Sequence, residues 1–284
     1  MKKYVIIGMG YVAEKHLKAI KQTGGNLIAS LDLRDGVGIL DSYFPNCSHF
    51  TEFERFDRFC SGKDIDYTVV CSPNYLHSSH CFFGLRIGSD VICEKPLVLH
   101  ERNLDNLIVM QNLTHHRIWN ILQLRLGDTV EQIRQTIQTT NSDNVFLEYV
   151  VSRGSWYDYS WKGNEEKSGG PLFNIGIHLF DLLLHLFGRR WEIRRWRGDH
   201  RYQDGTLFIG GFDVGISLDI SSDIAPIRSL SIGNEDFDLS KNFTDLHAES
   251  YRQILAGKGF GIESVRPAIK LCERLRNWKT RARS

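Results

Sequence analysis

The chain has 284 residues, which is enough for two compact domains or for one large α/β unit. Its 35 basic and 34 acidic side chains nearly cancel, so we expect no broad attraction to nucleic acid or to anionic lipid. Hydrophobic residues make up 42% and charged residues 24%, which excludes a disordered chain. An anionic ligand must therefore be bound by a local cluster of cations.

The sequence lacks the usual signals of export and membrane insertion. Met1–Tyr4 leads directly into a short apolar segment, without the hydrophobic region of a signal peptide. The stretch Ile175–Phe187 is short and interrupted by His and Asp, which argues against a membrane span. Six cysteines show no CxxC pair, and His115 and His116 have no carboxylate or thiol at ligand spacing. We expect a cytoplasmic protein with reduced thiols, no membrane insertion and no metal.

Residues 1–122 alternate apolar strands with helical patterns. Strands are predicted at Tyr4–Gly8, Asn26–Asp32, Tyr67–Ser72, Asp90–Glu94 and Arg117–Leu124, and helices at Tyr11–Thr23, Asn74–Ile87 and Glu101–Leu113. Strands with little polar alternation, separated by helices, predict a parallel sheet that is buried on both faces. With right-handed crossovers this is a doubly wound Rossmann domain of the α/β class.

Residues 123–284 are predicted to form an α+β domain with an open, mostly antiparallel sheet, which binds substrate and makes oligomer contacts. Strands are expected at Val145–Val151, Trp191–Arg197, Thr206–Ile209, Gly215–Ser221 and Arg228–Ile232, and helices at Asp128–Thr139, Pro171–Leu186, Asp245–Ala256 and Ser264–Arg276. The sheet should have an apolar face, and the helices can cover only one side. We therefore expect the uncovered side to pair with a second copy, in a homodimer or homotetramer.

The first predicted turn reads Gly-x-Gly-x-x-Ala, with Gly8, Gly10, Tyr11, Val12 and Ala13 as candidate cofactor-binding residues. The first glycine permits the tight turn and the second lets the backbone approach a pyrophosphate. The alanine allows close packing of helix on strand, and the helix N-terminus presents N–H groups to phosphates. The turn follows a strand and opens a helix, which is the context that a dinucleotide site requires.

Asp32, at the end of the second predicted strand, indicates which dinucleotide binds. A carboxylate there accepts hydrogen bonds from ribose hydroxyls and repels a 2′-phosphate. Arg34 could pair with that phosphate but is better explained as a solvated loop residue. The cofactor is therefore expected to be NAD.

Three further motifs carry a family resemblance. They are Cys71–His77 (CSPNYLH), Cys93–Leu97 (CEKPL) and Gly169–Asp181 (GGPLFNIGIHLFD). Together with the first turn, and in this order, they resemble the Gfo/Idh/MocA oxidoreductase family over essentially the whole chain. The resemblance implies a Rossmann domain followed by a sheet-based substrate domain that pairs sheet to sheet.

A narrower resemblance is to the WlbA/WbpB type, the UDP-N-acetylglucosaminuronate 3-dehydrogenases of bacterial surface-polysaccharide (lipopolysaccharide, O-antigen) synthesis. It rests on Ile121–Leu126, Ser152–Tyr157, Ser160–Gly163, Glu166–Gly170, Asn174–His178 and Phe243–His247. It implies oxidation of the C3 hydroxyl of UDP-GlcNAcA to a ketone, which a separate aminotransferase then aminates. The chain is shorter than this type around Cys60–Asp64 and within Arg197–Gly211, which affects oligomer contacts more than chemistry.

Lys95 and His178 are the candidate catalytic residues. Lys95 lies at the carboxyl end of a parallel strand, where open α/β sheets bind ligands, and the resemblance implies that it contacts both nicotinamide and the reacting hydroxyl. His178 lies four residues after Asn174 on one predicted helix face, and its pKa range suits a general base. Many relatives carry Asp where Asn174 stands; Asn cannot take a proton and can only orient the substrate.

The remaining candidates contact cofactor or substrate. Ser72, Asn74 and His77 are expected to line the cofactor channel, with Asn74 also explicable as a helix cap. Glu94, Lys95, Gln123 and Trp161 are assigned to the cofactor through the resemblance. For the substrate, aromatic faces can stack on sugar or uracil and cations can meet diphosphate and carboxylate. The substrate candidates are Lys95, Arg153, Trp156, Tyr157, Lys162, Lys167, Asn174, His178 and His247, with Arg125 secondary.

Two alternatives stay open at this stage. The substrate could be neutral UDP-N-acetylglucosamine, although a uronate better explains the cations of the loop 152–170. The chain could also be a non-catalytic NAD(H)-binding protein, because fold alone does not fix function. The sequence leaves open whether NADH is released or reoxidised in place by a 2-oxo acid.

Overall fold

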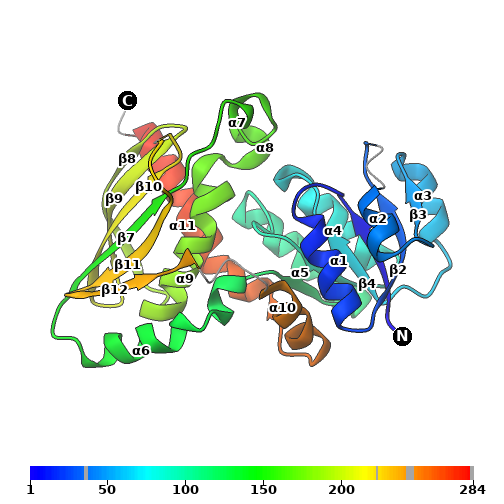
Figure 1. Ribbon diagram of the computed structural model, residues 1–284, viewed down its shortest axis with the longest axis horizontal. Helices are drawn as coiled ribbons and strands as arrows, with labels where there is room; N and C mark the ends of the chain where they lie inside the picture. Colours follow the sequence, from blue (N-terminus) through cyan, green and yellow to red (C-terminus); the bar gives the residue numbers. More distant parts are fainter. Residues whose placement is uncertain (35–37, 222, 241–245, 282–284) are drawn as a thin grey trace. The chain divides into compact units, whose positions relative to one another are not determined.

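The computed structural model describes residues 1–34, 38–221, 223–240 and 246–281 (Figure 1). Backbone contacts divide the chain into two compact units. The first contains Met1–Ile121 and His247–Val265, and the second contains Leu122–Leu246 and Arg266–Ser284. The sequence analysis treated everything after residue 122 as one domain, so it did not anticipate that His247–Val265 returns to the first unit.

Among the described residues, the first unit contains a seven-stranded sheet in the order β13-β6-β5-β4-β1-β2-β3. The strands are β1 (Lys3–Ile7), β2 (Asn26–Leu31), β3 (Ser48–Phe50), β4 (Tyr67–Val70), β5 (Asp90–Cys93), β6 (Ile118–Asn120) and β13 (Phe260–Gly261). Neighbours are parallel except β13, which is antiparallel to β6. The doubly wound α/β prediction is confirmed, although the short strands β3 and β13 were overlooked.

Alternate residues of β1 enter two different cores, as expected for a strand buried on both faces. Tyr4 and Ile6 pack in one core with residues of α1 and α10, while Val5 and Ile7 pack in another that contains Phe56. The helices are α1 (Ala13–Gln22), α2 (Gly38–Tyr43), α3 (Phe53–Cys60), α4 (His77–Arg86), α5 (Glu101–Thr114) and α10 (Leu246–Leu255). The carboxyl ends of β1, β2, β4 and β5 consequently meet at one edge of this sheet, where a ligand site is expected.

The second unit holds a six-stranded sheet within the described part of the chain, ordered β12-β11-β7-β10-β9-β8. The strands are β7 (Asn144–Val150), β8 (Trp191–Gly198), β9 (Tyr202–Ile209), β10 (Phe212–Asp219), β11 (Ile227–Ile232) and β12 (Glu235–Asp238). Only β10 and β7 are parallel, so the mostly antiparallel prediction is confirmed. Gly210 and Gly211 join β9 to β10 with φ of 59° and 103°, a conformation that suits a two-residue hairpin turn.

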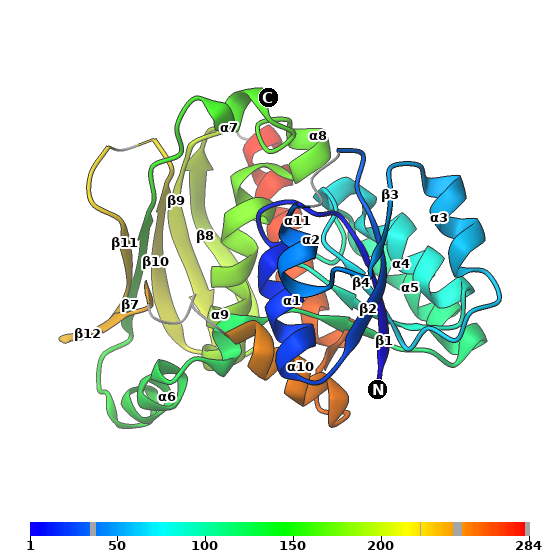
Figure 2. The ribbon, with the colours of Figure 1, turned by 45° about the vertical axis from the view of Figure 1, so that its right-hand side comes forward.

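Helix α9 lies along one face of this sheet (Figure 2), and the rings of Phe180 and Trp196 meet at a centroid distance of 5.9 Å. The helical elements are η2 (Gln123–Leu126), α6 (Thr129–Thr139), α7 (Trp156–Tyr159), α8 (Glu165–Ser168), η3 (Leu172–Gly176), α9 (Ile177–Phe187) and α11 (Ile262–Arg281). Element η3 is a π turn, so the helix predicted to begin at Pro171 starts with a wider turn than expected. Such turns are frequent at functional sites.

The two faces of the six-stranded sheet differ in composition. Leu147 and Ile216 are buried on the face toward α9, whereas Ser217 and Ser231 lie on the other face and Phe146 there is 46% exposed. The uncovered face is therefore mainly small and polar rather than apolar. Apolar burial alone does not explain a pairing of two copies through this face.

The helical stretch Glu165–Phe187 is long and apolar enough to cross a membrane by length and composition, with a mean hydropathy of 1.4. The sequence analysis considered only Ile175–Phe187 and judged it too short. However, 78% of its most apolar window is buried inside the protein, as in the core helix of a globular domain.

Candidate functional site

The turn after β1 has the geometry of a phosphate cradle. Gly8 has φ +96°, and a Cβ there would lie 2.6 Å from the carbonyl of Cys71 and 2.7 Å from the Ser72 nitrogen. Only glycine fits, because the end of β4 passes directly beside it. At Gly10, by contrast, a Cβ would meet nothing within 4 Å, so the backbone there borders open space that a pyrophosphate can occupy.

Asp32 follows β2 and is fixed by two backbone donors. The Met9 N–H donates to its Oδ2 at 2.6 Å, and the Arg34 N–H donates to its Oδ1 at 2.9 Å. Each carboxylate oxygen has two lone pairs, so each keeps one for a ribose hydroxyl. The carboxylate is thus held beside the phosphate turn, with its capacity for a ribose intact.

Replacing Asp32 with Ser should relax the choice between NAD and NADP. In the unmodified protein, NAD should bind about a hundred-fold more tightly, because a 2′-phosphate beside a carboxylate costs several kcal/mol. Calorimetric titration with each dinucleotide measures the ratio, and Arg34→Ala serves as the matched control that should leave it unchanged. Equal affinities of the unmodified protein for both dinucleotides would contradict the role given to Asp32.

Lys95 is the partly exposed residue in an otherwise buried run from Val91 to Leu99. It directly follows Glu94 and precedes Pro96 through a cis peptide bond. The amide of Asn120 donates to the carbonyl oxygens of Cys93 and Glu94, at 2.8 and 3.2 Å. The backbone that carries Lys95 is therefore anchored from the neighbouring strand β6, while its side chain reaches the surface at the end of β5.

Glu94 and His247 lie in the interior of the first unit, which differs from the roles expected for them. The Nε2 atoms of His16 and His247 each lie 3.0 Å from Glu94 Oε1. Burial raises the pKa of Glu94, but these hydrogen bonds outweigh burial and hold it well below its usual range. His247 is thus a buried partner of Glu94 instead of a surface contact for substrate; of the motif 243–247, residues 243–245 lie outside the described residues.

His77 also lies inside the protein. Its Nδ1 lies 2.7 Å from the Pro96 carbonyl and its Nε2 lies 2.7 Å from the Ser72 carbonyl. Burial lowers the pKa of His77, and the neutral ring donates its one N–H to one of these two oxygens at a time. His77 therefore lies between the ends of β4 and β5 in the interior of the first unit. Asn74 begins the short turn η1 (Asn74–Leu76) and does not cap α4, whose N-terminal cap is Leu76, so the helix-cap reading is wrong.

His80 should make the protein lose stability in acid. Burial and the neighbouring His77 lower the pKa of His80 from 6.5 to about 4, and its Nδ1 bonds the Ser72 hydroxyl. A lowered histidine pKa means that the unfolded chain takes up a proton first, so stability is lost as the pH falls below 6.5. The loss between pH 7 and pH 5 should be about 2 kcal/mol for this residue. Urea unfolding at pH 7 and at pH 5 measures the loss of unfolding free energy. In His80→Gln this loss should be smaller by about the contribution of His80, and an unchanged pH dependence in the variant would contradict the assignment.

Asn174 and His178 stand out in the second unit by their exposure. From Ser168 to Leu184 they alone are partly exposed, while every other residue in that described stretch is buried. The Asn174 amide donates to the Tyr157 hydroxyl at 3.1 Å, which ties the π turn to α7. The four-residue spacing places both side chains at the surface of the helix, as the sequence pattern predicted.

Arg125 and Asp181 form a buried pair that links η2 to α9. The guanidinium donates to both carboxylate oxygens of Asp181, at 2.8 and 2.6 Å. Burial raises the pKa of Asp181, and Arg125 opposes that effect. Arg125, considered a secondary substrate candidate, is thus engaged with Asp181 in the interior of the second unit.

Arg153 and Lys162 bring two positive charges together in the loop between β7 and α9. The Lys162 Nζ lies 5.3 Å from the Trp156 ring centroid and 5.8 Å from that of Trp161. Burial, and then repulsion by Arg153, lowers the pKa of Lys162. Within the described residues neither of these two cations has an acidic partner. Lys167, the third lysine or arginine predicted in this loop to bind substrate, is exposed, whereas Arg153 and Lys162 are half-buried. These two cations are suited to hold an anion.

Arg201, in the turn between β8 and β9, braces this loop and was missed by the sequence analysis. It donates to the Arg153 carbonyl at 2.8 Å and to Asp158 Oδ2 at 2.6 Å, and its guanidinium lies 6.0 Å from the Tyr157 ring centroid. An arginine in an ordinary β-turn carries no sequence signal for such a role. Its proximity to the loop arises only when β8 and β9 fold against β10.

Gln123 has an orphaned acceptor that fits the cofactor role expected for it. Its Oε1 is buried and has no hydrogen-bond partner within the described residues. A buried unpaired acceptor is costly, so a ligand N–H is the natural partner. Within the first unit, the open space at Gly10 and the carboxylate of Asp32 are the observations on which a dinucleotide fits the residues present.

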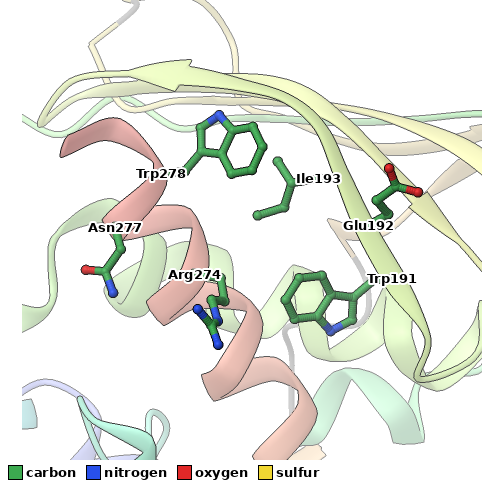
Figure 3. A pocket seen from close by; sticks show the side chains of 6 residues that line it. All are labelled: Trp191, Glu192, Ile193, Arg274, Asn277 and Trp278. Carbon is green, nitrogen blue, oxygen red and sulfur yellow. The ribbon is translucent and has the colours of Figure 1, made fainter. Parts of the chain in front are cut away.

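A cavity of about 420 Å³ lies between β8 and α11, away from all predicted site residues in sequence. Figure 3 shows the indoles of Trp191 and Trp278 around it, with Arg274 and Asn277 of α11. It contains neither Lys95 nor His178. The cavity does not take part in the chemistry assigned to those residues.

Two family models match the chain. The oxidoreductase family model with an NAD-binding Rossmann fold, Gfo/Idh/MocA, covers residues 2–120, and the C-terminal α/β domain of the same family covers residues 131–194. Among solved structures, the WlbA (WbpB) dehydrogenase from Thermus thermophilus, in complex with NAD and α-ketoglutarate, is 38% identical with a TM-score of 0.92. The match covers 97% of this chain and 95% of that one.

The same Thermus enzyme in complex with NAD and UDP-GlcNAcA is 37% identical over 97% of this chain and 95% of that one, with a TM-score of 0.91. A curated relative, the 2,7-anhydro-N-acetylneuraminate hydratase of Mediterraneibacter gnavus, is 28% identical over 213 residues, or 72% of this chain and 54% of that protein. The chain thus spans about half the length of the curated relatives it matches. The resemblance noted from the sequence motifs is confirmed.

Proposed function

This chain belongs to the Gfo/Idh/MocA oxidoreductase family, and we propose that it is a NAD-dependent dehydrogenase that oxidises the C3 hydroxyl of UDP-GlcNAcA to a ketone. The observation that carries the proposal is the 37% identity, over nearly the full length, to a dehydrogenase solved with NAD and UDP-GlcNAcA. Family membership alone would not suffice, because a 28% identical relative is a hydratase.

In this proposal the first unit supplies the phosphate and ribose contacts of the cofactor, and Gln123 of the second unit supplies one further contact. NAD, when bound, supplies the hydride acceptor. The turn at Gly8 and Gly10 would hold its pyrophosphate, Asp32 its ribose hydroxyls, and Gln123 Oε1 an amide N–H. The three contacts are made by the glycine turn, by the Asp32 carboxylate and by the unpaired Gln123 Oε1. All three groups are already in place without a ligand.

Lys95 and His178 divide the proton chemistry. Oxidation of a secondary alcohol needs a base for the hydroxyl proton and a positive group beside the developing alkoxide. His178 would accept the proton, because an imidazole ring nitrogen can act as a general base. The ammonium of Lys95 would stabilise the negative oxygen, and the Asn174 amide would orient the sugar by hydrogen bonding.

Arg153 and Lys162 would recognise the anionic parts of the substrate, and Trp156 would offer a stacking face. The pair has no acidic partner within the described residues, so a bound carboxylate or diphosphate would relieve the repulsion between them. As the substrate is a nucleotide sugar, the enzyme would act in the cytoplasm in the synthesis of a bacterial surface polysaccharide. A 2-oxo acid is the proposed hydride acceptor for regeneration, since the Thermus enzyme was solved with α-ketoglutarate.

The test is incubation of the purified protein with NAD and either UDP-GlcNAcA or UDP-GlcNAc, with NADH absorbance and product mass followed together. We expect a product of UDP-GlcNAcA that is lighter by two hydrogens. If NADH formation stops after the first turnover, adding 2-oxoglutarate as the hydride acceptor should sustain the turnover and yield 2-hydroxyglutarate. If only UDP-GlcNAc is turned over, the substrate is the neutral sugar and the proposal of UDP-GlcNAcA is wrong. If NAD binds tightly but neither sugar is turned over, the protein is better explained as a non-catalytic NAD-binding protein.

We also propose that the uncovered face of the six-stranded sheet pairs with that of a second copy. Cross-strand partners on this face form two rows, each with an arginine on β8 and an acid on β12: Arg195, Thr206, Gly215, Phe146, Ser231 and Asp236 form one row, and Arg197, Asp204, Ser217, Glu148, Ser229 and Asp238 the next. Within the chain, Asp204 pairs with both arginines, at 3.7 Å from Arg195 and 2.6 Å from Arg197. A two-fold axis along the strands would set each arginine edge over the acidic edge of the partner.

Replacing Arg195 and Arg197 together with Glu should therefore weaken the dimer by about ten-fold or more, since like charges would then face each other. Light scattering at several micromolar concentrations, at low and at high salt, measures the mass. Arg190→Glu, outside the two rows, is the control. A monodisperse monomer of the unmodified protein would contradict the pairing.

A further inference from the structure

Four buried polar side chains surround the segment that carries Lys95. His16, His77, Asn120 and His247 are at most 4% exposed, and they come from α1, α4, β6 and α10. Each is hydrogen-bonded to the segment Cys93–Pro96. Burying a polar group is costly unless it is paired, so four such groups on one short segment need a reason beyond filling space.

The Glu94 carboxylate lies at the centre of this arrangement, and its charge fixes the state of its partners. A carboxylate only accepts hydrogen bonds, so the Nε2 atoms of His16 and His247 must both carry the protons that they share with Oε1. Burial lowers the pKa of His16, which therefore stays neutral. Its Nδ1 is then an acceptor, and the Tyr251 hydroxyl donates a hydrogen bond to it at 2.8 Å.

The second oxygen of Glu94 connects this chain of bonds to Lys95. The Lys95 backbone N–H donates to Oε2 at 3.2 Å. On the other side, His77 holds the carbonyl of Pro96, and Asn120 holds the carbonyls before Lys95. The peptide groups on both sides of Lys95 are consequently restrained by buried polar contacts.

The two histidines on Glu94 also come from functionally placed elements. His16 is on α1, the helix that begins just after the phosphate turn, and His247 is on α10, the first helix of the chain's return to the first unit. One hydrogen bond thus links the phosphate-binding helix to the strand end at Lys95. The other forms only after the chain has passed through residues 122–246 and come back.

We propose that His16 and His247 are positioning residues, which hold Glu94 ionised and fixed so that it sets the place of Lys95. The proposal rests on the proposed function, in which Lys95 meets the reacting hydroxyl. A displacement of about an ångström at a reacting group can cost on the order of a hundred-fold in rate. A purely structural role would lower stability and leave the turnover of the folded protein unchanged.

His16, Glu94 and His247 also have the donor types of a metal site, and their ligand atoms lie within 4.8 Å of one another. The two N···O contacts of 3.0 Å are, however, already satisfied by protons. A divalent ion would have to displace both protons from a buried site. The hydrogen-bonded state accounts for both Nε2 atoms and for both oxygens of Glu94, and a stoichiometric metal in the purified protein would overturn the proposal.

The test compares His247→Gln with His247→Met and His247→Asn. The Gln amide nitrogen reaches about as far as Nε2 of histidine and keeps the donor to Glu94, whereas Met has no donor and the amide of Asn is too short. We expect kcat to fall about ten- to a hundred-fold in the Met and Asn variants, with NAD affinity within about two-fold of the parent, and to recover in the Gln variant. If the Met variant does not fold, the comparison of Gln with Asn decides.

Ser89→Ala is the matched structural control, since Ser89 is fully buried in the same unit and bonds Thr68 and Gly84 without touching Glu94. It should lower the melting temperature and leave kcat unchanged. Equal losses of kcat in the Gln and Met variants, or an unchanged kcat in the Met variant, would overturn the proposal.

A readout without substrate separates this proposal from the proposed function. Labelled dimethyl-lysine signals in NMR spectra, with the Lys95→Arg spectrum as the assignment, report the surroundings of Lys95 directly. The Lys95 signal should move in the Met variant and return in the Gln variant, even if no UDP-sugar is turned over. A signal that stays in place in all three His247 variants would sink the positioning role whatever the substrate is.

Discussion

Lys95→Ala and His178→Ala should each lower kcat by about 10²–10⁴-fold, the usual contribution of a positioned acid–base group. This corresponds to about 2.7–5.5 kcal/mol of lost transition-state stabilisation. Lys95 is the partly exposed residue at the end of a buried parallel strand, and His178 is one of two partly exposed residues in a buried helical stretch. Both are placed where a side chain can reach a ligand while its backbone stays fixed. Steady-state kinetics with NAD and UDP-GlcNAcA measures the effect.

Two variants separate loss of chemistry from general damage. Lys63→Ala removes an exposed lysine that lies over the Phe59 ring, and His185→Gln alters another histidine of α9, which contacts Arg134. Both should retain turnover within about two-fold, as surface and secondary positions usually do. NAD affinity should change little in the Lys95 and His178 variants, because the phosphate turn and Asp32 are intact. Near-normal turnover in both alanine variants would refute their assignment.

The features of the first unit that could be predicted from the sequence depend on local chemistry. The glycine at position 8 is required by a positive φ and by the approach of Cys71, and the carboxylate at position 32 must follow the second strand to meet a ribose. Both requirements concern residues close to one turn. The strands β1, β4 and β5 are likewise marked by continuous apolar runs, because a parallel sheet with helices on both faces leaves no polar side.

The contacts around Glu94 depend on long-range packing and could not be read in this way. His16 and His247 are separated from Glu94 by 78 and 153 positions, and nothing in their local sequence indicates a buried partner. The return of α10 to the first unit has the same cause, because it is decided by the core around Tyr4 and Tyr251 rather than by helix propensity. His247 was assigned to the substrate from the sequence, whereas in the structure its Nε2 bonds Glu94 inside the first unit.

The loop cations show how burial and charge narrow a substrate hypothesis. Arg153 and Lys162 are both half-buried, and the pKa of Lys162 is lowered by burial and by Arg153. The Arg201 guanidinium donates hydrogen bonds to Asp158 and to the backbone carbonyls of Arg153 and Ile220, and these bonds hold the loop in place. An anion between Arg153 and Lys162 would restore the charge balance. A uronate carboxylate and a diphosphate both have the necessary negative charge. UDP-GlcNAcA carries both groups, whereas UDP-GlcNAc carries only the diphosphate.

Arg153→Ala should therefore lower kcat/KM for UDP-GlcNAcA about ten- to a hundred-fold, because a lost charge-assisted contact in a partly buried site costs about 1.5–3 kcal/mol. Lys162→Ala should act in the same direction, while Lys167→Ala, at an exposed position of α8, is the control that should change little. If either cation pairs with the carboxylate, the neutral UDP-GlcNAc should be affected much less, since it never makes that contact. Parallel losses for the two sugars in both variants would instead assign the cations to the diphosphate. A preference of the unmodified enzyme for the neutral sugar would overturn the uronate as substrate, because two half-buried cations would then discriminate against the charge that they are placed to receive.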